Sequence, residues 1–357
     1  MSSWPRPSST RPRPSSSTPP WTAWPVTSAA EPTDEFDTIE RLFRPLAQGA
    51  PEARGLLDDV AVIPSRPGQD LVVTKDAMVE GVHFLAEDPL DLVARKLLRV
   101  NLSDLAAKGA DPYGYLLSIS WSKRCDGLAR EAFAAGLRED QAHYGIKLFG
   151  GDTTSTPGPL TASITALGWT PTGRTVARAG AKPGDVLMVS GAIGDGWLGL
   201  QAAKGELAHL EEARIEALAR RYRLPEPRTV LARLVRDHAS ASADVSDGLV
   251  ADAGHLAEAG KVGIEIALDH LPLSRAAKAW LEHRVDPAAS LLDLATGGDD
   301  YEIVCAVRPD RVEALAKGAE RAGVPFTAIG RVVAGEGVQV MFEGQPVEVR
   351  HAGWRHK

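Results

Sequence analysis

The chain has 357 residues, more than a single hydrophobic core usually holds, so its length predicts two domains. Hydrophobic residues make up 44% and charged residues 24% of the chain, which is ordinary for a soluble globular protein. The net charge of −7, without a basic stripe outside a short N-terminal stretch, excludes a nucleic-acid-binding surface, and no apolar run reaches the roughly 18–20 residues of a membrane span.

Residues 1–33 are rich in Ser and Pro and contain no acidic residue before Glu31. Such a composition buries too little apolar surface to fold, so we predict a disordered tail without a catalytic role. The stretch lacks the apolar core of a secretory signal, and its prolines oppose the amphipathic helix of a transit peptide. The only two cysteines, Cys125 and Cys305, belong to no metal or redox motif, so we expect free thiols and a cytoplasmic protein.

Apolar periodicity and turn residues predict helices and strands throughout the rest of the chain. In residues 34–181 we predict, in order, a helix near 36–43, strands at 60–63 and 71–74, a helix from 88 to 109, a strand at 115–120, a helix at 127–144, and strands at 147–149 and 161–167. The turn Lys182-Pro183-Gly184-Asp185 marks the start of a second domain, residues 182–357. There we predict a strand at 186–189 in a strand–loop–helix unit ending at 204, helices within 209–222 and 227–237, a strand–turn–helix unit at 241–259, and an α/β region from 291 onward. Because both halves mix strands and helices, we expect α/β or α+β layering in each.

Six short acidic motifs lie at predicted strand ends or turns. A single one would mean little, because aspartate is common in turns and at helix N-termini. Six of them, several beside glycine and hydroxyl residues, favour binding of Mg²⁺, which prefers oxygen ligands and bridges carboxylates to substrate phosphates. Several ions would also explain how an acidic chain binds a nucleoside triphosphate. The motifs are Leu57-Asp58-Asp59, Thr74-Lys75-Asp76, Asn101-Leu102-Ser103-Asp104, Gly150-Gly151-Asp152-Thr153-Thr154, Asp244-Val245-Ser246-Asp247-Gly248 and Gly297-Gly298-Asp299-Asp300-Tyr301-Glu302.

The standard nucleotide-binding signatures are missing from the sequence. No GxxxxGK[ST] motif occurs, and the conserved motif set of protein kinases is absent. The segment Gly191–Gly196 follows a strand and opens a helix, but its glycine spacing is not that of a dinucleotide site. We interpret it as a tight turn and leave open whether it contacts a phosphate.

In this order, the motifs resemble those of the thiamine-monophosphate kinase family, which belongs to the superfamily of aminoimidazole ribonucleotide synthetase. The resemblance covers about residues 35–354, and its most specific segments are 79–84, 101–107, 150–154, 244–249 and 298–302. It implies a two-domain α/β (α+β) fold, in which an N-terminal mixed-sheet domain dimerises and a C-terminal α/β domain completes the nucleotide and substrate site. It also implies a homodimer that transfers the ATP γ-phosphate directly to thiamine monophosphate, the last step of thiamine diphosphate biosynthesis.

The resemblance further implies roles for individual residues. The Mg²⁺ ligands would be Asp59, Thr74, Asp76, Asp104, Asp152, Asp244 and Asp247. Contacts to ATP, the co-substrate, would come from Gly151, Asp152, Arg178 and Ser246, and contacts to thiamine monophosphate from His83, Asp299 and Trp354. No general base is expected, because a phosphate monoester is already largely ionised at neutral pH. Metal ions and Arg178 would assist the in-line transfer.

The chain departs from the family pattern at two motif positions. Leu57 replaces the usual glycine before the first Asp-Asp pair, and Lys75 stands where a threonine commonly precedes the second aspartate. Lys75 is open to three interpretations: a neighbour of the metal site, a phosphate contact or a solvent-facing side chain. His83, Arg178 and Trp354 also fit packing or surface roles.

Three other functions remain open at this point. The chain could be another ATP-dependent enzyme of the same superfamily. It could be a metal-dependent phosphohydrolase that activates water with its aspartates. It could also be a thiamine-phosphate-binding protein without turnover.

Overall fold

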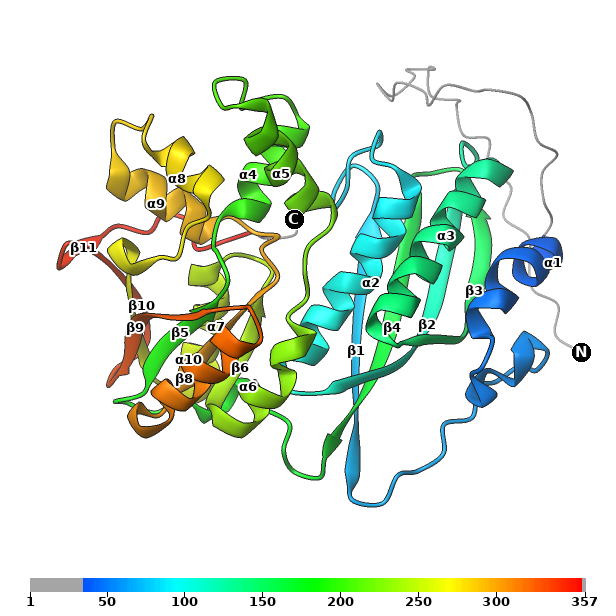
Figure 1. The fold of residues 1–357 in the computed structure, drawn as a ribbon, viewed down its shortest axis with the longest axis horizontal. Helices are drawn as coiled ribbons and strands as arrows, with labels where there is room; N and C mark the ends of the chain where they lie inside the picture. Colours follow the sequence, from blue (N-terminus) through cyan, green and yellow to red (C-terminus); the bar gives the residue numbers. More distant parts are fainter. Residues whose placement is uncertain (1–34, 355–357) are drawn as a thin grey trace, which may run out of the picture.

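The computed structural model describes residues 35–354, and the predicted N-terminal tail lies outside this range. The chain forms two β-sheets side by side, each with its own helices (Figure 1). The strands of the first sheet come from residues 69–171 and those of the second from residues 186–347. The mixed α/β layering expected from the sequence is therefore present in both halves. Among the described residues, no helix is both long and apolar enough to cross a membrane.

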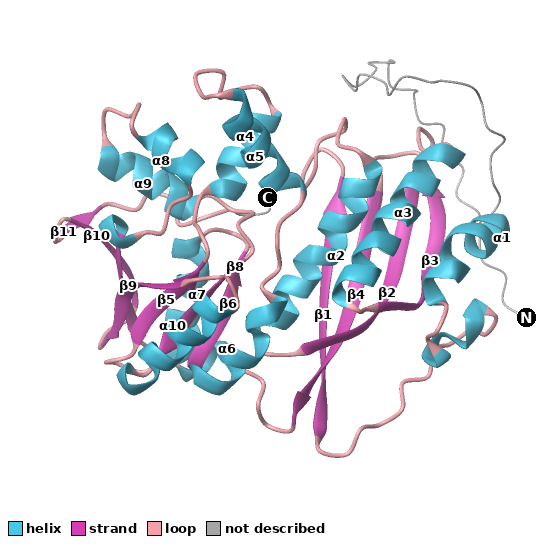
Figure 2. Cartoon of the chain, viewed as in Figure 1, coloured by secondary structure: helices cyan, strands magenta, loops and turns pink. Residues whose placement is uncertain are grey.

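The first sheet has four strands in the order β1-β4-β2-β3. Their bounds are β1 Gln69–Val79, β4 Thr161–Pro171, β2 Asp111–Ser122 and β3 Lys147–Thr156. Only β2 and β3 run parallel, so the sheet is mixed. Helices α2 (Leu90–Ala107) and α3 (Gly127–Tyr144) lie over one face of it (Figure 2). The apolar core of this domain lies between these helices and the sheet.

Helix α3 shows why the sequence predicted its bounds well. The Asp126 side chain accepts a hydrogen bond from the Ala129 backbone N–H (2.8 Å), which caps the first turn. Gly145 ends the helix in the left-handed conformation (φ 67°), which glycine adopts without a steric cost. Both signals are local, so they can be identified in the sequence.

The second sheet has seven strands in the order β11-β10-β7-β9-β5-β8-β6. Their bounds are β5 Val186–Ser190, β6 Ala239–Val245, β7 Gly263–Ala267, β8 Glu302–Val307, β9 Phe326–Val333, β10 Gly337–Phe342 and β11 Gln345–Val347. The helices are α4 Asp195–Ala203, α5 Glu212–Arg223, α6 Ala232–His238, α7 Leu249–Gly260, α8 Arg275–Leu281, α9 Pro287–Thr296 and α10 Val312–Arg321. Helices α7 and α9 pack on one face and α6 and α10 on the other, while α4, α5 and α8 form a separate cluster.

Helix α2 lies at the boundary between the two domains. Its residues Leu97 and Leu102 belong to the core of the first domain, whereas Ala106 and Ala107 pack with residues of the second domain, such as Val235. All of these side chains are completely buried. Helix α2 therefore contributes residues to the cores of both domains. Its polar side chains consequently lie where the two domains meet.

The strand predicted at 60–63 is wrong. The segment is extended but pairs with no strand, although the Val62 N–H donates to the Glu52 carbonyl (3.0 Å). Its alternating pattern is real, because Ala61 and Ile63 pack on a small apolar cluster while Val60 and Val62 are exposed. Alternation shows which side of an extended segment is buried, but it does not supply a partner strand.

Two further differences concern element bounds. The predicted strands at 71–74 and 147–149 extend to β1 and β3, because polar and glycine residues of the acidic motifs continue the pairing. Strand β7 and helix α8 are elements that we did not predict. The first predicted helix is present as α1 (Glu35–Thr38), which continues as a π-helical turn and a 3₁₀ turn to Ala47.

Candidate active site

Four aspartates from both domains form one electrostatic group, which we call the central carboxylates: Asp76, Asp104, Asp244 and Asp247. Burial and the charges of Asp104 and Asp247 raise the pKa of Asp76 from its ordinary value of 3.8 to about 7. Burial and neighbouring carboxylates, Asp104 foremost, raise the pKa of Asp244 well above its usual range. These carboxyl groups therefore influence one another's ionisation across the two domains. Four of the seven predicted metal ligands therefore converge.

Local structure explains how the first domain supplies its part of this group. Side chains alternate along β1, so Thr74 and Asp76 point to the same face of the sheet, toward α2. The Thr74 hydroxyl donates a hydrogen bond to the Asp104 carboxylate on α2. The side chain of Asn101, one helical turn before Asp104, accepts the Asp76 backbone N–H (3.0 Å). Asn101 thus fixes the strand to the helix, and it is completely buried.

In the second domain, Asp252 fixes the loop that carries Asp247. One carboxylate oxygen of Asp252 accepts the backbone N–H groups of Ser246, Asp247 and Gly248 at 3.0–3.2 Å. Burial and the charge of Asp247 raise the pKa of Asp252 to about 7. Sequence analysis missed Asp252, although an acidic residue in the first turn of a helix after an acidic loop is a recognisable signal. Ligand atoms of Asp247, Asp252 and His255 lie within 4.8 Å of one another, so these three could also hold a cation.

Two cationic side chains lie close to the central carboxylates. Lys108 follows α2, and its ammonium group donates to the Ser242 carbonyl of β6. Burial, with the charge of Arg178, lowers the pKa of Lys108 to about 8, while Asp244 and Asp104 oppose this shift. The exposed Arg178 is therefore near enough to act on the same group of charges. Lys108 was not predicted, since nothing in its local sequence indicates a partner on β6.

The structure brings two of the three predicted acceptor contacts together. The ammonium group of Lys96 donates to the His83 carbonyl (3.2 Å) and to the Asp299 carboxylate (3.0 Å). The Tyr301 hydroxyl donates to the other oxygen of Asp299 (3.1 Å). Burial, Asp299, Asp76 and Asp244 raise the pKa of Tyr301, so Tyr301 lies between this pair and the central carboxylates. The predicted acceptor contacts His83 and Asp299 and the central carboxylates are thus neighbours.

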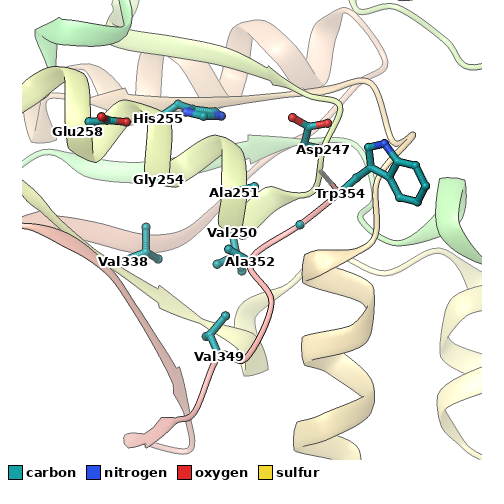
Figure 3. A pocket seen from close by; sticks show the side chains of 11 residues that line it. Asp247, Val250, Ala251, Gly254, His255, Glu258, Val338, Val349, Ala352 and Trp354 are labelled. Atoms are coloured by element: carbon teal, nitrogen blue, oxygen red, sulfur yellow. The ribbon is translucent and has the colours of Figure 1, made fainter. Parts of the chain in front are cut away.

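Trp354 adjoins the same loop from the C-terminal segment. Its backbone N–H donates to the Asp247 carbonyl (2.9 Å), and its side chain is 55% exposed. Figure 3 shows Asp247 and Trp354 at one end of a pocket of about 720 Å³, which extends along α7 toward Glu258 and Val338. An exposed indole beside a carboxylate loop can contact a cationic ring.

Thr74, a fifth predicted ligand, contacts Asp104, whereas the last two predicted ligands lie elsewhere. Asp59 and Asp152 line a second cavity of about 570 Å³, together with Gly151. The register across the sheet pairs Asp76 with Ile164, whereas Asp152 pairs with Ser118 in the adjacent, opposite-facing row. Asp152 therefore points to the face away from α2, three strands or roughly 14 Å from β1. Within one chain, these carboxylates do not join the central group.

Gly151 has a structural reason to be glycine. Its backbone has φ 152°, and a side-chain Cβ there would lie 1.7 Å from the Leu117 carbonyl oxygen of β2. Only glycine permits this close approach of two strands beside a bulge. The same property leaves its backbone accessible to a ligand in the second cavity.

The two departures from the family pattern are explained by the structure. Lys75 lies on the face of β1 away from Asp76 and donates to the Ser163 hydroxyl (3.1 Å). Of the three interpretations of Lys75, the solvent-facing side chain agrees with its exposed position in this chain. Leu57 is 77% exposed and has an ordinary backbone conformation (φ −110°), so the position needs no glycine.

Two acidic residues of the last motif have structural roles instead. The buried Asp300 carboxylate accepts the backbone N–H groups of Gly194 (2.7 Å) and Gly196 (2.9 Å). The turn that the sequence left open as a phosphate contact is therefore filled by the chain's own carboxylate. Glu302, also completely buried, accepts hydrogen bonds from Ser190, Arg221 and Arg228. Of the motif's acids, only Asp299 faces the site, with 30% of its side chain exposed.

Family models and a curated relative assign the chain to the same family. Residues 57–170 match the model of the N-terminal domain of AIR synthase related proteins, and residues 182–343 match that of the C-terminal domain. Thiamine-monophosphate kinase of Caulobacter vibrioides is 56% identical over 328 residues, which cover 92% of each chain. Together, the two models match most of the chain.

Two solved structures have the same fold and substantial identity. The crystal structure of thiamine-monophosphate kinase from Stenotrophomonas maltophilia K279a is 37% identical, with a TM-score of 0.77, and the match covers 88% of this chain and 98% of that one. A structure described as AaThiL complexed with AMPPCP and TMP is 31% identical, with a TM-score of 0.72, covering 90% and 97%. The two-domain architecture inferred from the motifs is thereby confirmed. The chain belongs to the thiamine-monophosphate kinase family of AIR synthase related proteins.

Proposed function

We propose that this protein transfers the γ-phosphate of ATP to thiamine monophosphate, giving thiamine diphosphate and ADP, and that it does so in the cytoplasm, where ATP is available. The observation that carries the proposal is the junction of the two domains. There the central carboxylates adjoin Tyr301, and Tyr301 adjoins the linked pair of Asp299 and His83. A phosphotransferase needs such an adjacent pair of sites, one for a polyphosphate and one for its acceptor.

The central carboxylates fit several Mg²⁺ ions. Burial raises the pKa of Asp76 and of Asp244, and the charges of neighbouring carboxylates raise both further, so a divalent cation would relieve that repulsion. We propose Asp76, Asp104, Asp244 and Asp247 as ligands, with Thr74 orienting Asp104. When bound, Mg²⁺ would neutralise charge on the phosphate oxygens.

The other predicted site residues position the two reactants, ATP and thiamine monophosphate. Arg178 and Asp244 both act on the charge of Lys108, so Arg178 supplies a positive charge in this region that suits a nucleotide phosphate. The amide-bound loop at Ser246 keeps Asp247 in place. His83, Asp299 and Trp354 would hold the acceptor, whose thiazolium cation suits an aromatic ring and a carboxylate. No side chain needs to remove a proton, because the attacking phosphate oxygen is already ionised at neutral pH. Positioning and charge compensation account for the acceleration.

We also propose a homodimer formed through the open face of the first sheet. Leu71, Val73 and Leu116 are 38%, 56% and 38% exposed on the side away from α2 and α3. Exposed apolar side chains grouped on one face are typical of a protein–protein interface. The cavity with Asp59 and Asp152 is on this side as well, so a second copy would lie against it. We propose that Asp59, Asp152 and Gly151 contribute to the metal and ATP site only in the dimer.

The domain boundary is proposed at Lys182, with units 34–181 and 182–357. The last strand of the first sheet ends at Pro171, and the first strand of the second sheet begins at Val186. The turn Lys182–Asp185 between them is closed by the Asp185 side chain, which accepts the Lys182 backbone N–H (3.1 Å). A closed turn between two sheets supports a boundary at this point.

One assay tests the function. Purified protein is incubated with ATP, MgCl₂ and thiamine monophosphate, and thiamine diphosphate and ADP are followed by chromatography. We expect equal amounts of the two products. Free phosphate without thiamine diphosphate would indicate a phosphohydrolase, and binding of thiamine monophosphate without any product would indicate a silent binding protein.

Two variants and a control assign the carboxylates. Asp247→Asn removes a central carboxylate and should abolish turnover while the fold, followed by circular dichroism, is retained. Asp152→Asn tests the second cavity and should also abolish turnover if the dimer completes the site. Asp310→Asn alters an exposed surface aspartate and should leave the rate unchanged. Wild-type rates in both site variants would contradict the metal assignment.

A further inference from the structure

Lys96 is a buried lysine at the junction of the two domains. It lies on α2, and only 3% of its side chain is exposed. Its ammonium group donates to the His83 carbonyl of the first domain and to the Asp299 carboxylate of the second. It also lies 3.8 Å from the ring centroid of Tyr222, on α5. The contacts therefore join three segments that are distant in the sequence.

Each of the three N–H donors of the Lys96 ammonium group has a partner within the protein. A buried ammonium group is costly unless hydrogen bonds and an opposite charge compensate it. Here a carbonyl and a carboxylate accept two donors, and the aromatic face of Tyr222 is the third partner. No donor is left to bind a phosphate. Lys96 is consequently unsuited to contact substrate and suited to hold its neighbours.

The loop that Lys96 contacts has an uncommon backbone. Asp299 and Tyr301 have positive φ angles of 70° and 52°, which non-glycine residues adopt only when surrounding contacts hold them. Two backbone bonds provide part of this restraint, from Asp299 N–H to the Ser246 carbonyl (2.9 Å) and from Tyr301 N–H to the Val245 carbonyl (2.7 Å). They fix the main chain, whereas Lys96 is the cationic partner that fixes the Asp299 side chain.

We propose that Lys96 is a positioning residue that assembles the acceptor site by holding the Asp299 carboxylate against the turn at His83. The inference rests on the proposed function, because Asp299 and His83 contact the acceptor only under that proposal. Lys96 also compensates the charge of Asp299 before substrate binds. The carboxylate therefore meets the acceptor in a fixed orientation.

Steady-state kinetics provides the first test. In Lys96→Met, the KM for thiamine monophosphate should rise about tenfold to a hundredfold, the range for loss of a charged hydrogen bond, while the KM for ATP stays within twofold of wild type. Lys204→Met, which changes an exposed lysine after α4, is the matched control and should change neither constant. If Lys96→Met does not fold, Lys96→Gln keeps a donor at nearly the same position and should show a smaller rise. An unchanged KM for thiamine monophosphate in a folded Lys96 variant would overturn the proposal.

A double-mutant cycle tests whether Lys96 acts through Asp299. If it does, Lys96→Met combined with Asp299→Asn should have the same KM for thiamine monophosphate as Asp299→Asn alone. Multiplying effects would show that Lys96 acts independently of the Asp299 carboxylate, and would overturn its role in holding that carboxylate.

Hydrogen exchange supplies a readout that needs no turnover. In Lys96→Met, the amides of Asp299 and Tyr301 should exchange about tenfold faster than in wild type, while amides of the sheet cores do not change. Unchanged exchange at these amides would contradict the positioning role. If wild-type protein makes no thiamine diphosphate, the proposed function fails, and amide exchange still decides the role of Lys96.

Discussion

Replacing Asp76 by asparagine should stabilise the metal-free protein at pH 8. Asp76 is half-buried, and burial together with the charges of Asp104 and Asp247 raises its pKa from 3.8 to about 7. Between these pH values, the folded state holds a proton that the unfolded chain has released. Stability contributed by this group is therefore present at low pH and lost as the pH rises toward 7. Asparagine does not ionise, so it avoids this loss.

The size of the effect follows from the pKa. At pH 8, ionisation of Asp76 costs the folded state about 4 kcal/mol, and about 3 kcal/mol of this develops between pH 5 and pH 8. The unfolding free energy of Asp76→Asn relative to wild type should therefore rise by about 3 kcal/mol over that interval. Magnesium should reduce the difference, because wild type would gain about 1.4 kcal/mol when the free ion is at ten times its dissociation constant.

Urea unfolding at pH 5 and pH 8, first with EDTA and then with MgCl₂, measures these differences. Asp310→Asn serves as the control, since its side chain is exposed and its ion pair contributes little. If Asp76→Asn has the same stability relative to wild type at both pH values, mutual repulsion among the central carboxylates is refuted. A Mg²⁺ gain of equal size in the variant would show that Asp76 is no ligand.

Three further predictions concern other parts of the molecule. Glu302→Gln should lower the unfolding free energy by about 3 kcal/mol, because two partly buried guanidinium groups lose their charged, completely buried partner; an unchanged urea midpoint would contradict this. Trp354→Ala should raise the KM for thiamine monophosphate about two- to fivefold, the value of a cation–π contact at an exposed position, and an equal rise for ATP would refute the assignment. Deletion of residues 1–33 should leave kcat and both KM values unchanged, and a large loss in either would show that the tail takes part in catalysis.

The sequence predicted the features whose causes are local. Helix α3 matches its predicted bounds because the residues that end it act locally. Asp126 caps its first turn, and Gly145 terminates its last turn. The central carboxylates were found because each belongs to a short motif with a chemical preference of its own. Local signals also explain the failure at 60–63, where an alternating segment lacked a neighbouring strand.

The features that could not be predicted depend on partners far away in the sequence. Lys96 and Asp299 are 203 positions apart, and neither has a local pattern that indicates the other. The separation of Asp152 from Asp76 required the strand order β1-β4-β2-β3, because alternation alone does not relate the faces of two strands in different parts of the chain. Single motifs therefore identified the candidate ligands, whereas the strand order decided which of them lie close together.

The turn at Gly194 and Gly196 shows how easily a search for glycine-rich loops would misplace a nucleotide in this fold. Asp300 imitates an anionic ligand there, with two main-chain amides directed at its oxygens at the beginning of α4. Shortening that one side chain would vacate a ready-made cradle of the kind that binds oxyanions in unrelated proteins. Protein engineers seeking a second anion receptor on this scaffold would therefore begin by removing a group rather than by adding one.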